Sequence, residues 1–585
     1  MKSLQKLNKF LWKYKWRLLL GFVFTISANF VQVYSVTFIR EAINTVEGLL
    51  TNFGENSEQS LDFLKQGLMY ASLAFLGFKI LGGALTVGTR QMIIVTSRLI
   101  EFDLKNKIYQ HYQHLSLSFY KKNKTGDLMN RITEDVALVR MYLGPGIMYP
   151  VDLFSRVLII GYFMSRVDKD LTLYTLLPLP ILSILIYNVA NRINQRSKKV
   201  QQQQSTISSS VQDTFAGIRV IKSFNTEEYT KTNYAVEAEE YQKRALHLSQ
   251  IQAAFGPLMV IVVGVSNLII LYLGGLKYIN GDLDIGAIAE FFLYLNMLIW
   301  PFTSLGWITT VVQRAEASMT RINEFLDQKS EIIDHPDNKM DIEGDIEFSN
   351  VSYVYDNTGI EALKDVSFKI KKGETLAILG KTGSGKSTIA LLVARLLEPT
   401  SGKILFDNID MHDISVESIR KQIGYVPQEA FLFSDSLANN ILFGSDETEL
   451  DVAKKFAKKA VVADNIDRFK EKYDTVVGER GVTLSGGQKQ RVSIARALVN
   501  DPNILIFDDS LSAVDTETEE QILNNLASDF DAKTSIIITH RVSSAKNADQ
   551  IIFLDEGKII ESGSHEELLM KKGFYYELFN KQIAD

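Results

Sequence analysis

Hydrophobic and polar positions follow two different patterns along the chain, and the change falls near residue 325. Before it, long apolar runs alternate with charged connections. After it, short apolar runs of strand length alternate with segments of helical composition. Six of the early runs are long enough to cross a bilayer, and they lie near 16–39, 66–90, 140–164, 169–190, 253–276 and 286–312. The pattern predicts an all-α transmembrane domain of six helices over 1–326, a charged linker over 327–342, and an α/β domain over 343–585.

The connections between these runs differ sharply in charge. The N-terminal segment and the connections 90–140 and 191–250 are rich in Lys and Arg, whereas the 40–65 connection is mainly acidic. Positively charged connections stay in the cytoplasm, so we expect both termini and the two long connections there. No small-residue cleavage site follows the first apolar run, so we expect this run to remain as a span. The sequence predicts a multi-pass membrane protein in contact with lipid, with both termini in the cytoplasm.

Composition excludes several kinds of chemistry. The chain has 585 residues and a formal net charge of −6, which gives no bulk reason to expect a nucleic-acid partner. It contains no cysteine, whether this absence is natural or engineered, so disulfides, thiolate metal sites and a cysteine nucleophile are excluded.

The α/β domain begins with a phosphate-binding loop of the pattern GxxxxGKS. A buried strand, 375–379, precedes the loop and a helical segment follows it, which is the context the motif requires. Backbone N–H groups of such a loop converge on phosphate oxygens at a helix N-terminus, the lysine reaches the β- and γ-phosphates, and the serine ligates Mg²⁺. The predicted ATP ligands here are Gly380, Lys381, Thr382, Gly383, Ser384, Gly385, Lys386, Ser387 and Thr388.

Further candidate residues follow the loop in order. Gln428 ends an apolar run, where its amide could meet Mg²⁺ or the attacking water. Asp508 ends a buried strand and is suited to hold Mg²⁺, while the next residue, Asp509, could orient or deprotonate the hydrolytic water. His540 is either a polar strand end or a contact to the γ-phosphate. A second phosphate cradle is predicted where a helical segment starts, at Ser485, Gly486, Gly487 and Gln488.

Tyr355 ends an alternating strand ahead of the loop. It is either an ordinary strand aromatic or a stacking platform for adenine.

Taken in this order, the motifs resemble the ATP-binding cassette of an ABC transporter. The resemblance identifies a Walker A motif at 380–387, a Q-loop at Gln428, a signature at 484–488, a Walker B motif ending at Asp508, a D-loop at 512–515 and a switch histidine at His540. The segment 475–481 is similar to the X-loop of exporters, and 125–135 and 217–224 resemble the coupling regions of six-span exporter half-transporters. This resemblance implies an ATPase that exports or flips an amphipathic drug, lipid or peptide, with ATP and Mg²⁺ as cofactors. It also implies a location in a bacterial inner (plasma) membrane.

The resemblance also implies a dimer, because in this family the signature of one cassette completes the ATP site of the other. One position departs from the family pattern: Asp509 stands where a glutamate is usual, and a shorter carboxylate should place the water poorly. Two interpretations stay open. The chain forms a homodimer with slowed hydrolysis, or it pairs with a different chain that carries a Walker B glutamate. A nucleotide-gated channel or regulator is the alternative from another class of function.

Two features of the predicted membrane domain remain ambiguous. The glycine-punctuated tips 119–127 and 213–222 are either solvated turns or segments that dock on the ATP domain. Among ionisable residues in the spans, Asp152 and Arg156 are expected to pair with each other, and Glu290 to be exposed to water near the outer boundary. The asparagines and aromatic residues of the spans do not single out a substrate site.

Overall fold

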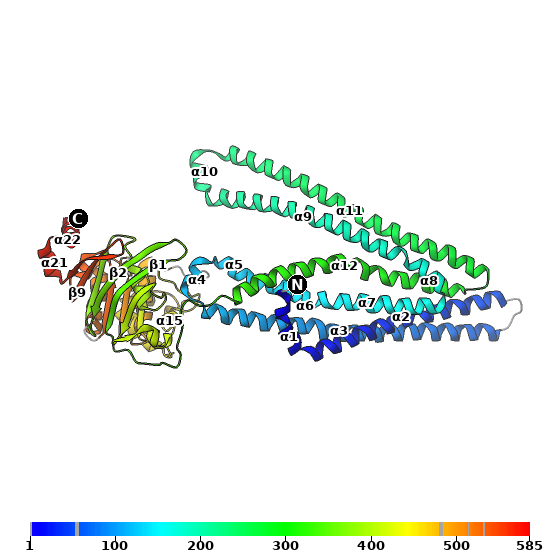
Figure 1. The fold of residues 1–585 in the computed structure, drawn as a ribbon, viewed down its shortest axis with the longest axis horizontal. Coiled ribbons are helices and arrows are strands. Elements are labelled where there is room, and N and C mark those ends of the chain that lie inside the picture. Colours follow the sequence, from blue (N-terminus) through cyan, green and yellow to red (C-terminus); the bar gives the residue numbers. More distant parts are fainter. Residues whose placement is uncertain (1–2, 53–57, 479–483, 513, 531–532, 585) are drawn as a thin grey trace. The chain divides into compact units, whose positions relative to one another are not determined.

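The computed structural model describes residues 3–52, 58–478, 484–512, 514–530 and 533–584. The chain divides into two compact units (Figure 1). The helical unit comprises residues 1–113 and 126–328. The α/β unit comprises residues 329–585 together with the short segment 114–125.

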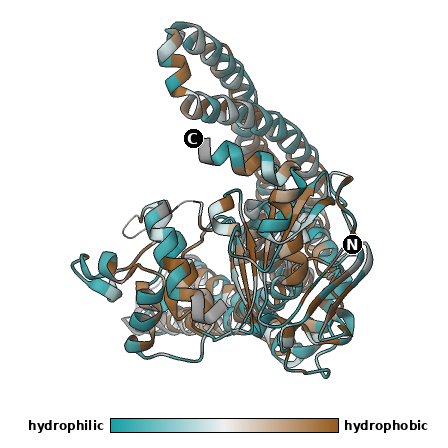
Figure 2. Cartoon of the chain, turned by 90° about the vertical axis from the view of Figure 1, so that its left-hand side faces the viewer, coloured by the Kyte–Doolittle hydropathy of each residue, from teal (hydrophilic) through white to brown (hydrophobic). Residues whose placement is uncertain are grey.

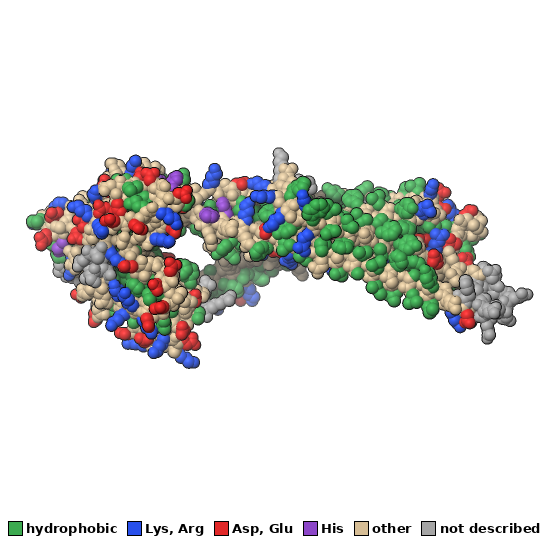
Figure 3. Space-filling view, turned by 90° about the horizontal axis from the view of Figure 1, so that it is seen from below, with side chains coloured by type: hydrophobic (Ala, Val, Ile, Leu, Met, Phe, Trp, Pro, Cys, Tyr) green, Lys and Arg blue, Asp and Glu red, His purple; other side chains and the backbone are tan. Residues whose placement is uncertain are grey.

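The helical unit has no strand among its described residues, and its helices follow the apolar runs of the sequence. Within the described part of the chain, six segments are long and apolar enough to cross a membrane: Lys15–Gly48, Lys65–His114, Thr125–Val167, Lys169–Ala216, Glu227–Ile279 and Ile285–Leu326. Hydrophobic side chains form a belt over one part of the surface of this unit, with Lys and Arg gathered beside it (Figure 3). The elements are η1 (Ser3–Leu7), α1 (Asn8–Lys13), α2 (Lys15–Asn52), α3 (Glu58–His114), α5 (Thr125–Asn130), η2 (Arg131–Asp135), α6 (Val136–Leu143), α7 (Pro145–Val167), α8 (Lys169–Leu176), α9 (Pro178–Ala216), α10 (Ile218–Phe224), α11 (Glu227–Ile279) and α12 (Ile285–Leu326).

Glu290 is buried, which corrects the expectation that it faces water. Its side chain is only 1% exposed. One carboxylate oxygen accepts a hydrogen bond from the Tyr294 hydroxyl at 2.7 Å, and the other lies 3.3 Å from the Arg40 guanidinium. Arg40 also pairs with Asp284, the residue that caps the start of α12. The charge was expected to need water, but an arginine from a helix about 250 residues away in sequence compensates it instead.

A second ion pair lies within α7, as expected. Arg156 Nε donates to Asp152 Oδ1 at 2.9 Å, one helical turn away. Asn29 of α2 donates to Ser155 Oγ at 2.7 Å and thereby joins α2 to the same turn of α7. The polar side chains of these helices therefore satisfy one another inside the unit.

The two long charged connections are helical extensions of the spans. Helix α3 continues to His114, and α9 and α11 run side by side as a hairpin with α10 at its tip (Figure 1). Phe215 and Phe224 at this tip are 70% and 75% exposed. The tip therefore presents uncovered apolar side chains in a single chain.

The α/β unit contains two sheets. A four-stranded antiparallel sheet has the order β2-β1-β4-β5, and a six-stranded sheet has the order β10-β9-β3-β8-β7-β6, in which only β10 is antiparallel to its neighbour. In Figure 2, hydrophobic colour gathers on the strands and on the inner faces of the helices around them. The strands are β1 (Ile346–Tyr355), β2 (Ile360–Ile370), β3 (Thr375–Gly380), β4 (Ser401–Phe406), β5 (Ile409–Asp410), β6 (Ile423–Val426), β7 (Ile504–Asp508), β8 (Thr534–Ile538), β9 (Gln550–Asp555) and β10 (Lys558–Gly563).

The helices of the α/β unit are short and surround the sheets. They are α4 (Leu117–Lys122), α13 (Lys386–Val393), η3 (Met411–Asp413), α14 (Val416–Lys421), α15 (Leu437–Ile441), α16 (Leu450–Lys459), α17 (Ala463–Asp467), η4 (Lys472–Asp474), α18 (Gly486–Leu498), α19 (Thr516–Phe530), α20 (Val542–Ala545), α21 (His565–Lys571) and α22 (Phe574–Ala584).

Two large hydrophobic cores organise the α/β unit. One fills the space between the two sheets and includes Ile378 of β3 and Ile389 of α13. The other lies under α15, α16 and α18 and includes Val492 and Ile494. The expected linker is packed on this unit, because Ile342 is fully buried in the first core and Asn338 accepts a hydrogen bond from Ser415 N at 2.9 Å.

Candidate nucleotide site

The predicted site residues gather at one edge of the six-stranded sheet. Strands β3, β6, β7 and β8 are parallel neighbours, so their carboxyl ends meet at the same edge. The phosphate loop leaves β3, Gln428 follows β6, Asp508 ends β7, and His540 follows β8. Sheet topology therefore brings together residues that are as much as 160 positions apart in sequence.

The phosphate loop needs glycine at two positions, both because φ is positive there and because a Cβ atom would clash with a nearby carbonyl oxygen. Gly380 has φ +151° and Gly385 has φ +103°, in the region where a side chain is strained. A Cβ atom on Gly380 would lie 2.1 Å from the Leu554 carbonyl oxygen, and one on Gly385 would lie 2.3 Å from that of Ala362. The loop is therefore a backbone cradle without side chains at its closest approaches, as a phosphate site requires.

Lys386, the first residue of α13, points back into this cradle. Its ammonium group donates to the carbonyl oxygens of Gly380 and Lys381 at 2.9 and 2.8 Å, and the residue is 7% exposed. Burial lowers the pKa of Lys386, and the nearby carboxylates Asp509 and Asp508 oppose that shift. The Ser384 hydroxyl is buried in the same loop without a hydrogen-bond partner among the described residues. An anionic ligand would satisfy both groups.

Asp508 is 3% exposed and holds the serine of the loop. Ser387 Oγ donates to one of its carboxylate oxygens at 2.7 Å, and the Tyr425 hydroxyl donates to the other at 3.2 Å. Burial raises the pKa of Asp508, while these two hydrogen bonds lower it. The serine and aspartate predicted to hold Mg²⁺ are therefore joined by a hydrogen bond, and both offer the oxygen ligands that this cation binds.

Asp509 differs from its neighbour in how its oxygens are used. Its Oδ2 accepts from Gln428 Nε2 at 3.2 Å, whereas its Oδ1 is buried without a hydrogen-bond partner among the described residues. The backbone is fixed in a left-handed conformation, φ +47°, and its N–H donates to the Ile538 carbonyl at 2.9 Å. The backbone of Asp509 is thus held in place, and its side chain contacts Gln428, the residue predicted to meet Mg²⁺ or the hydrolytic water.

His540 enters the site from β8. Burial lowers the pKa of His540 below its usual value, and the charge of Lys386 lowers it further. The imidazole is therefore neutral near pH 7, with one nitrogen able to donate and the other able to accept. Gln582 Nε2 anchors its backbone by donating to the His540 carbonyl oxygen at 2.7 Å.

Tyr355 lies beside the start of α13. Its hydroxyl is 3.2 Å from Thr388 Oγ1, and its ring is edge-on to Tyr353. The ammonium group of Lys121, on α4, lies 5.2 Å from the ring centroid. The ring is thus held next to the phosphate loop by a hydrogen bond at its tip.

The signature residues are not joined to the phosphate loop by any hydrogen bond between described residues. They begin α18, which belongs to the second hydrophobic core, whereas α13, the helix after the loop, belongs to the first. Ser485 Oγ accepts from Gln488 N at 3.3 Å, and Gln488 Oε1 accepts from Ser485 N at 3.0 Å, which makes a capping box. The start of α18 is exposed, so its positive end is open to a ligand. Two other motif segments are described only in part, because residues 479–481 and Ala513 lie outside the described residues.

Most of the first predicted tip, up to Thr125, belongs to the α/β unit itself. Lys122 of α4 lies 3.3 Å from Glu331 and 3.2 Å from Asp356, and Ser118 donates a hydrogen bond to Glu331. Asp356 directly follows Tyr355, so α4 contacts the edge of the site through adjacent residues.

Two residues that hydrogen-bond to predicted site residues were not predicted from the sequence. Tyr425 holds Asp508, and Gln490, which is 4% exposed, donates its Nε2 to the Gln428 carbonyl oxygen. Tyr425 lies three residues before Gln428, and Gln490 lies two residues after the signature. Their closeness to motifs was visible in the sequence, but their contacts depend on how β6, β7 and α18 pack.

Fold and site together define a membrane-spanning protein with a phosphate-binding ATPase unit. Two family models match the chain: ABC transporter transmembrane region over residues 18–302 and ABC transporter over residues 363–512. The chain belongs to the ABC transporter family. Specifically, it is an ATP-binding, ATP-hydrolysing exporter of the half-transporter type, a type that acts as a dimer.

Relatives and solved structures agree with this assignment. The chain is 36% identical to the probable multidrug resistance ABC transporter ATP-binding/permease protein YheI of Bacillus subtilis, with 99% of this chain and 97% of that protein covered. It is 32% identical to the ATP-dependent lipid A-core flippase of Syntrophus aciditrophicus, with 90% and 87% covered. A bacterial Atm1-family ABC exporter solved with ATP bound has 27% identity and a TM-score of 0.78, with 99% of each chain covered. These similarities favour an exporter over a nucleotide-gated channel or regulator.

Proposed function

We propose that this chain exports or flips an amphipathic small molecule or lipid across a bacterial inner membrane, as one half of a dimer driven by ATP. The observation that carries the proposal is that α13, the helix after the phosphate loop, and α18, the helix that the signature begins, belong to two different hydrophobic cores of one α/β unit. Each presents a positive helix N-terminus to an anion, and in the ABC family two chains bring such ends together around ATP. The positive charge of the connections in the helical unit supports a cytoplasmic location for both termini and the ATP site.

The donor set at the sheet edge supports binding of Mg·ATP. Lys386 and the glycine cradle would bind the phosphates, Ser387 and Asp508 would hold Mg²⁺, and Gln428 would approach it from β6. The metal would supply charge neutralisation on the phosphate oxygens. Neutral His540 would donate to the γ-phosphate, and Tyr355 would stack on adenine beside Thr388. The exposed residues Ser485 and Gly486, with the half-buried Gln488, would complete the site of the other chain.

Asp509 should slow hydrolysis at each ATP site that uses it. Its Oδ2 is occupied by Gln428, and its Oδ1 is buried on a backbone that cannot move toward the nucleotide without leaving β8. A general base must be within hydrogen-bond reach of the water, and one methylene fewer shortens that reach. We therefore expect Asp509→Glu to raise ATP turnover by about tenfold, a change of about 1.4 kcal/mol in the barrier. Asp509→Asn, which keeps the shape but cannot accept the proton, should lower it.

The test is made on the purified chain in lipid nanodiscs. Mass measurement gives the number of chains, and vanadate-sensitive ATP hydrolysis is measured for the parent and both Asp509 variants. A dimer that hydrolyses ATP alone supports the homodimer, whereas a chain that is inert until a second half-transporter is added supports the heterodimer. Equal turnover by the parent and both variants, with full dependence on Lys386, would show that Asp509 is not the positioning group.

A further inference from the structure

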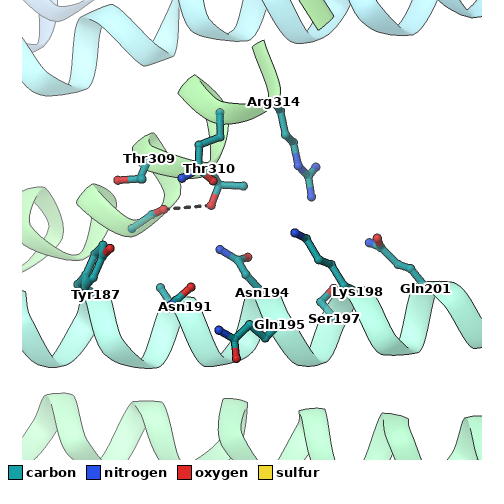
Figure 4. Close-up of a pocket in the computed structure, with 13 residues that line it drawn as sticks. Tyr187, Asn191, Asn194, Gln195, Ser197, Lys198, Gln201, Thr309, Thr310 and Arg314 are labelled. Carbon is teal, nitrogen blue, oxygen red and sulfur yellow. Dashed lines mark hydrogen bonds between the residues drawn. The ribbon is translucent and has the colours of Figure 1, made fainter. Parts of the chain in front are cut away.

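A cavity of about 310 Å³ lies between α9 and α12 of the helical unit (Figure 4). Its lining is polar although both helices carry membrane-spanning sequence. Asn191, Asn194 and Lys198 come from α9, and Thr310 and Arg314 from α12. Among the described residues that line it, none is an aspartate or glutamate.

These residues form one face of each helix. On α9 they recur at Tyr187, Asn191, Asn194 and Lys198, the spacing of side chains that share a helix face. On α12, Thr310 and Arg314 are one turn apart. Figure 4 shows Lys198 and Asn194 rising from α9 toward α12, with Arg314 extending toward them from the other side. Most of the α9 residues in this lining belong to the polar stretch that follows the apolar part of the helix, and they face a cavity instead of packing on α12.

The two cations of the cavity have no protein counter-charge. Among the described residues, neither Lys198 nor Arg314 forms an ion pair, and neither side chain makes a hydrogen bond with another residue. This contrasts with Arg156, which is paired with Asp152 at 2.9 Å, and with Arg40, which contacts two carboxylates. The nearest acidic residue along α9 on the C-terminal side is Asp213, fifteen positions from Lys198. Unpaired cations that border a partly enclosed space attract an anion.

The depth of the cavity fits the boundary of the hydrophobic layer. The apolar part of α9 ends near Ala190, and the helix continues as the polar stretch 191–216. At the apolar end of the lining, Tyr187 is 64% exposed. A molecule seated here would have its polar end between Lys198 and Arg314 and an apolar tail along Tyr187.

We propose that this cavity binds the anionic headgroup, of the phosphate or carboxylate class, of an amphipathic molecule that the protein exports. The inference rests on the proposed export function and names the chemical class of its cargo. It assigns Lys198 and Arg314 as the residues that select a negative headgroup, Asn191, Asn194 and Thr310 as hydrogen-bonding groups, and Tyr187 as a contact to the tail.

A matched set of probes tests this assignment on the full chain in phosphatidylcholine nanodiscs. Dodecyl phosphate carries the anionic headgroup and the tail, dodecyltrimethylammonium reverses the charge, dodecanol removes it, and inorganic phosphate removes the tail. Equilibrium binding and stimulation of ATP hydrolysis are measured for each. We expect dodecyl phosphate to bind at least tenfold more tightly than any of the other three and to be the strongest stimulator.

Variants locate the binding and guard against misfolding. Lys198→Gln with Arg314→Gln should weaken dodecyl phosphate at least tenfold and leave dodecanol within twofold. Lys199→Gln, the same charge change at the next position but outside the cavity lining, should leave all probes within twofold. Lys198→Glu with Arg314→Glu should reverse the order and favour dodecyltrimethylammonium, a gain that an unfolded variant cannot show.

Several outcomes would overturn the assignment. Equal binding of dodecyl phosphate by the parent and the double Gln variant would place its site elsewhere. Competition by inorganic phosphate at the same concentration would show a site for free anions rather than amphipaths. Binding without stimulation, which is competed by phosphatidylglycerol added to the nanodisc, would show a resident lipid instead of cargo. Failure of the export function is distinguishable, because ATP-dependent movement of every probe would then be absent while the binding measurements still report on the cavity.

Discussion

The helical unit and the α/β unit place their charged groups in different ways. In the α/β unit, charges stand at motif positions, and sheet topology turns them toward one edge, as with Lys386 and Asp508. In the helical unit, the charge of Glu290 is compensated by Arg40, which comes from another helix. In the α/β unit, the charged residues that would face a ligand therefore stand in sequence motifs, and the sheet brings them together. In the helical unit, a charge is structural or ligand-binding according to whether a remote helix supplies its partner.

The largest expected effect comes from the loop lysine and should leave the helical unit intact. Lys386→Ala removes the cation that the cradle directs at phosphate, so ATP turnover should fall about 10³-fold, or about 4 kcal/mol. The apparent Tm without nucleotide should change little. ATP hydrolysis and thermal unfolding in nanodiscs measure both quantities, with Lys372→Ala, an exposed lysine of the same unit, as control. Turnover above one tenth of the parent value would contradict the role given to Lys386.

The converse change should destabilise the helical unit and leave ATP hydrolysis by the folded protein unchanged. Arg40→Gln leaves Glu290 buried without its cation, which should cost about 3 kcal/mol of stability. The combined Arg40→Gln and Glu290→Gln variant should recover part of the loss, because no buried negative charge then remains at position 290. The control is Arg98→Gln, whose pair with Glu101 is exposed on the arginine side and should contribute less than about 1 kcal/mol. An unchanged apparent Tm for Arg40→Gln would mean that water, not Arg40, compensates Glu290.

The smallest expected effect on stability comes from the ion pairs that α4 forms within the α/β unit. Lys122→Ala removes ion pairs to Glu331 and Asp356, both largely exposed, so less than about 1 kcal/mol should be lost. Basal ATP turnover should persist, and the ratio of probe-stimulated to basal turnover should fall by no more than about fivefold. Lys124→Ala, an exposed lysine of the same segment, is the matched control. A complete loss of stimulation would show that these pairs contribute far more than exposed pairs usually do.

The same contrast explains what could be predicted from sequence. The six spans, the strand–loop–helix around Lys386 and the order of Gln428, Asp508 and His540 are properties of short segments, so periodicity and spacing indicate them. The hydrogen bond from Tyr425 to Asp508 and the support that Gln490 gives to Gln428 depend on strand order and on the packing of α18. Those contacts could not be predicted without the fold.

In the helical unit this limit is more severe. The expectation for Glu290 was wrong because its partner lies 250 residues away, and no local pattern shows which helix approaches. The polar cavity was missed for the same reason. Lys198 and Arg314 are ordinary cations near the ends of spans until α9 and α12 are placed face to face.

The most direct test of the account is uphill movement of cargo by the reconstituted parent chain, with a second half-transporter present if the chain alone is inert. Inside-out proteoliposomes expose the α/β units to added ATP, and accumulation of labelled dodecyl phosphate in their lumen is followed over time. The account predicts accumulation above the outside concentration with ATP, and none with a non-hydrolysable analogue or with Lys386→Ala. Equal accumulation by the parent and Lys386→Ala, or no movement of any amphipath despite rapid ATP hydrolysis, would contradict it.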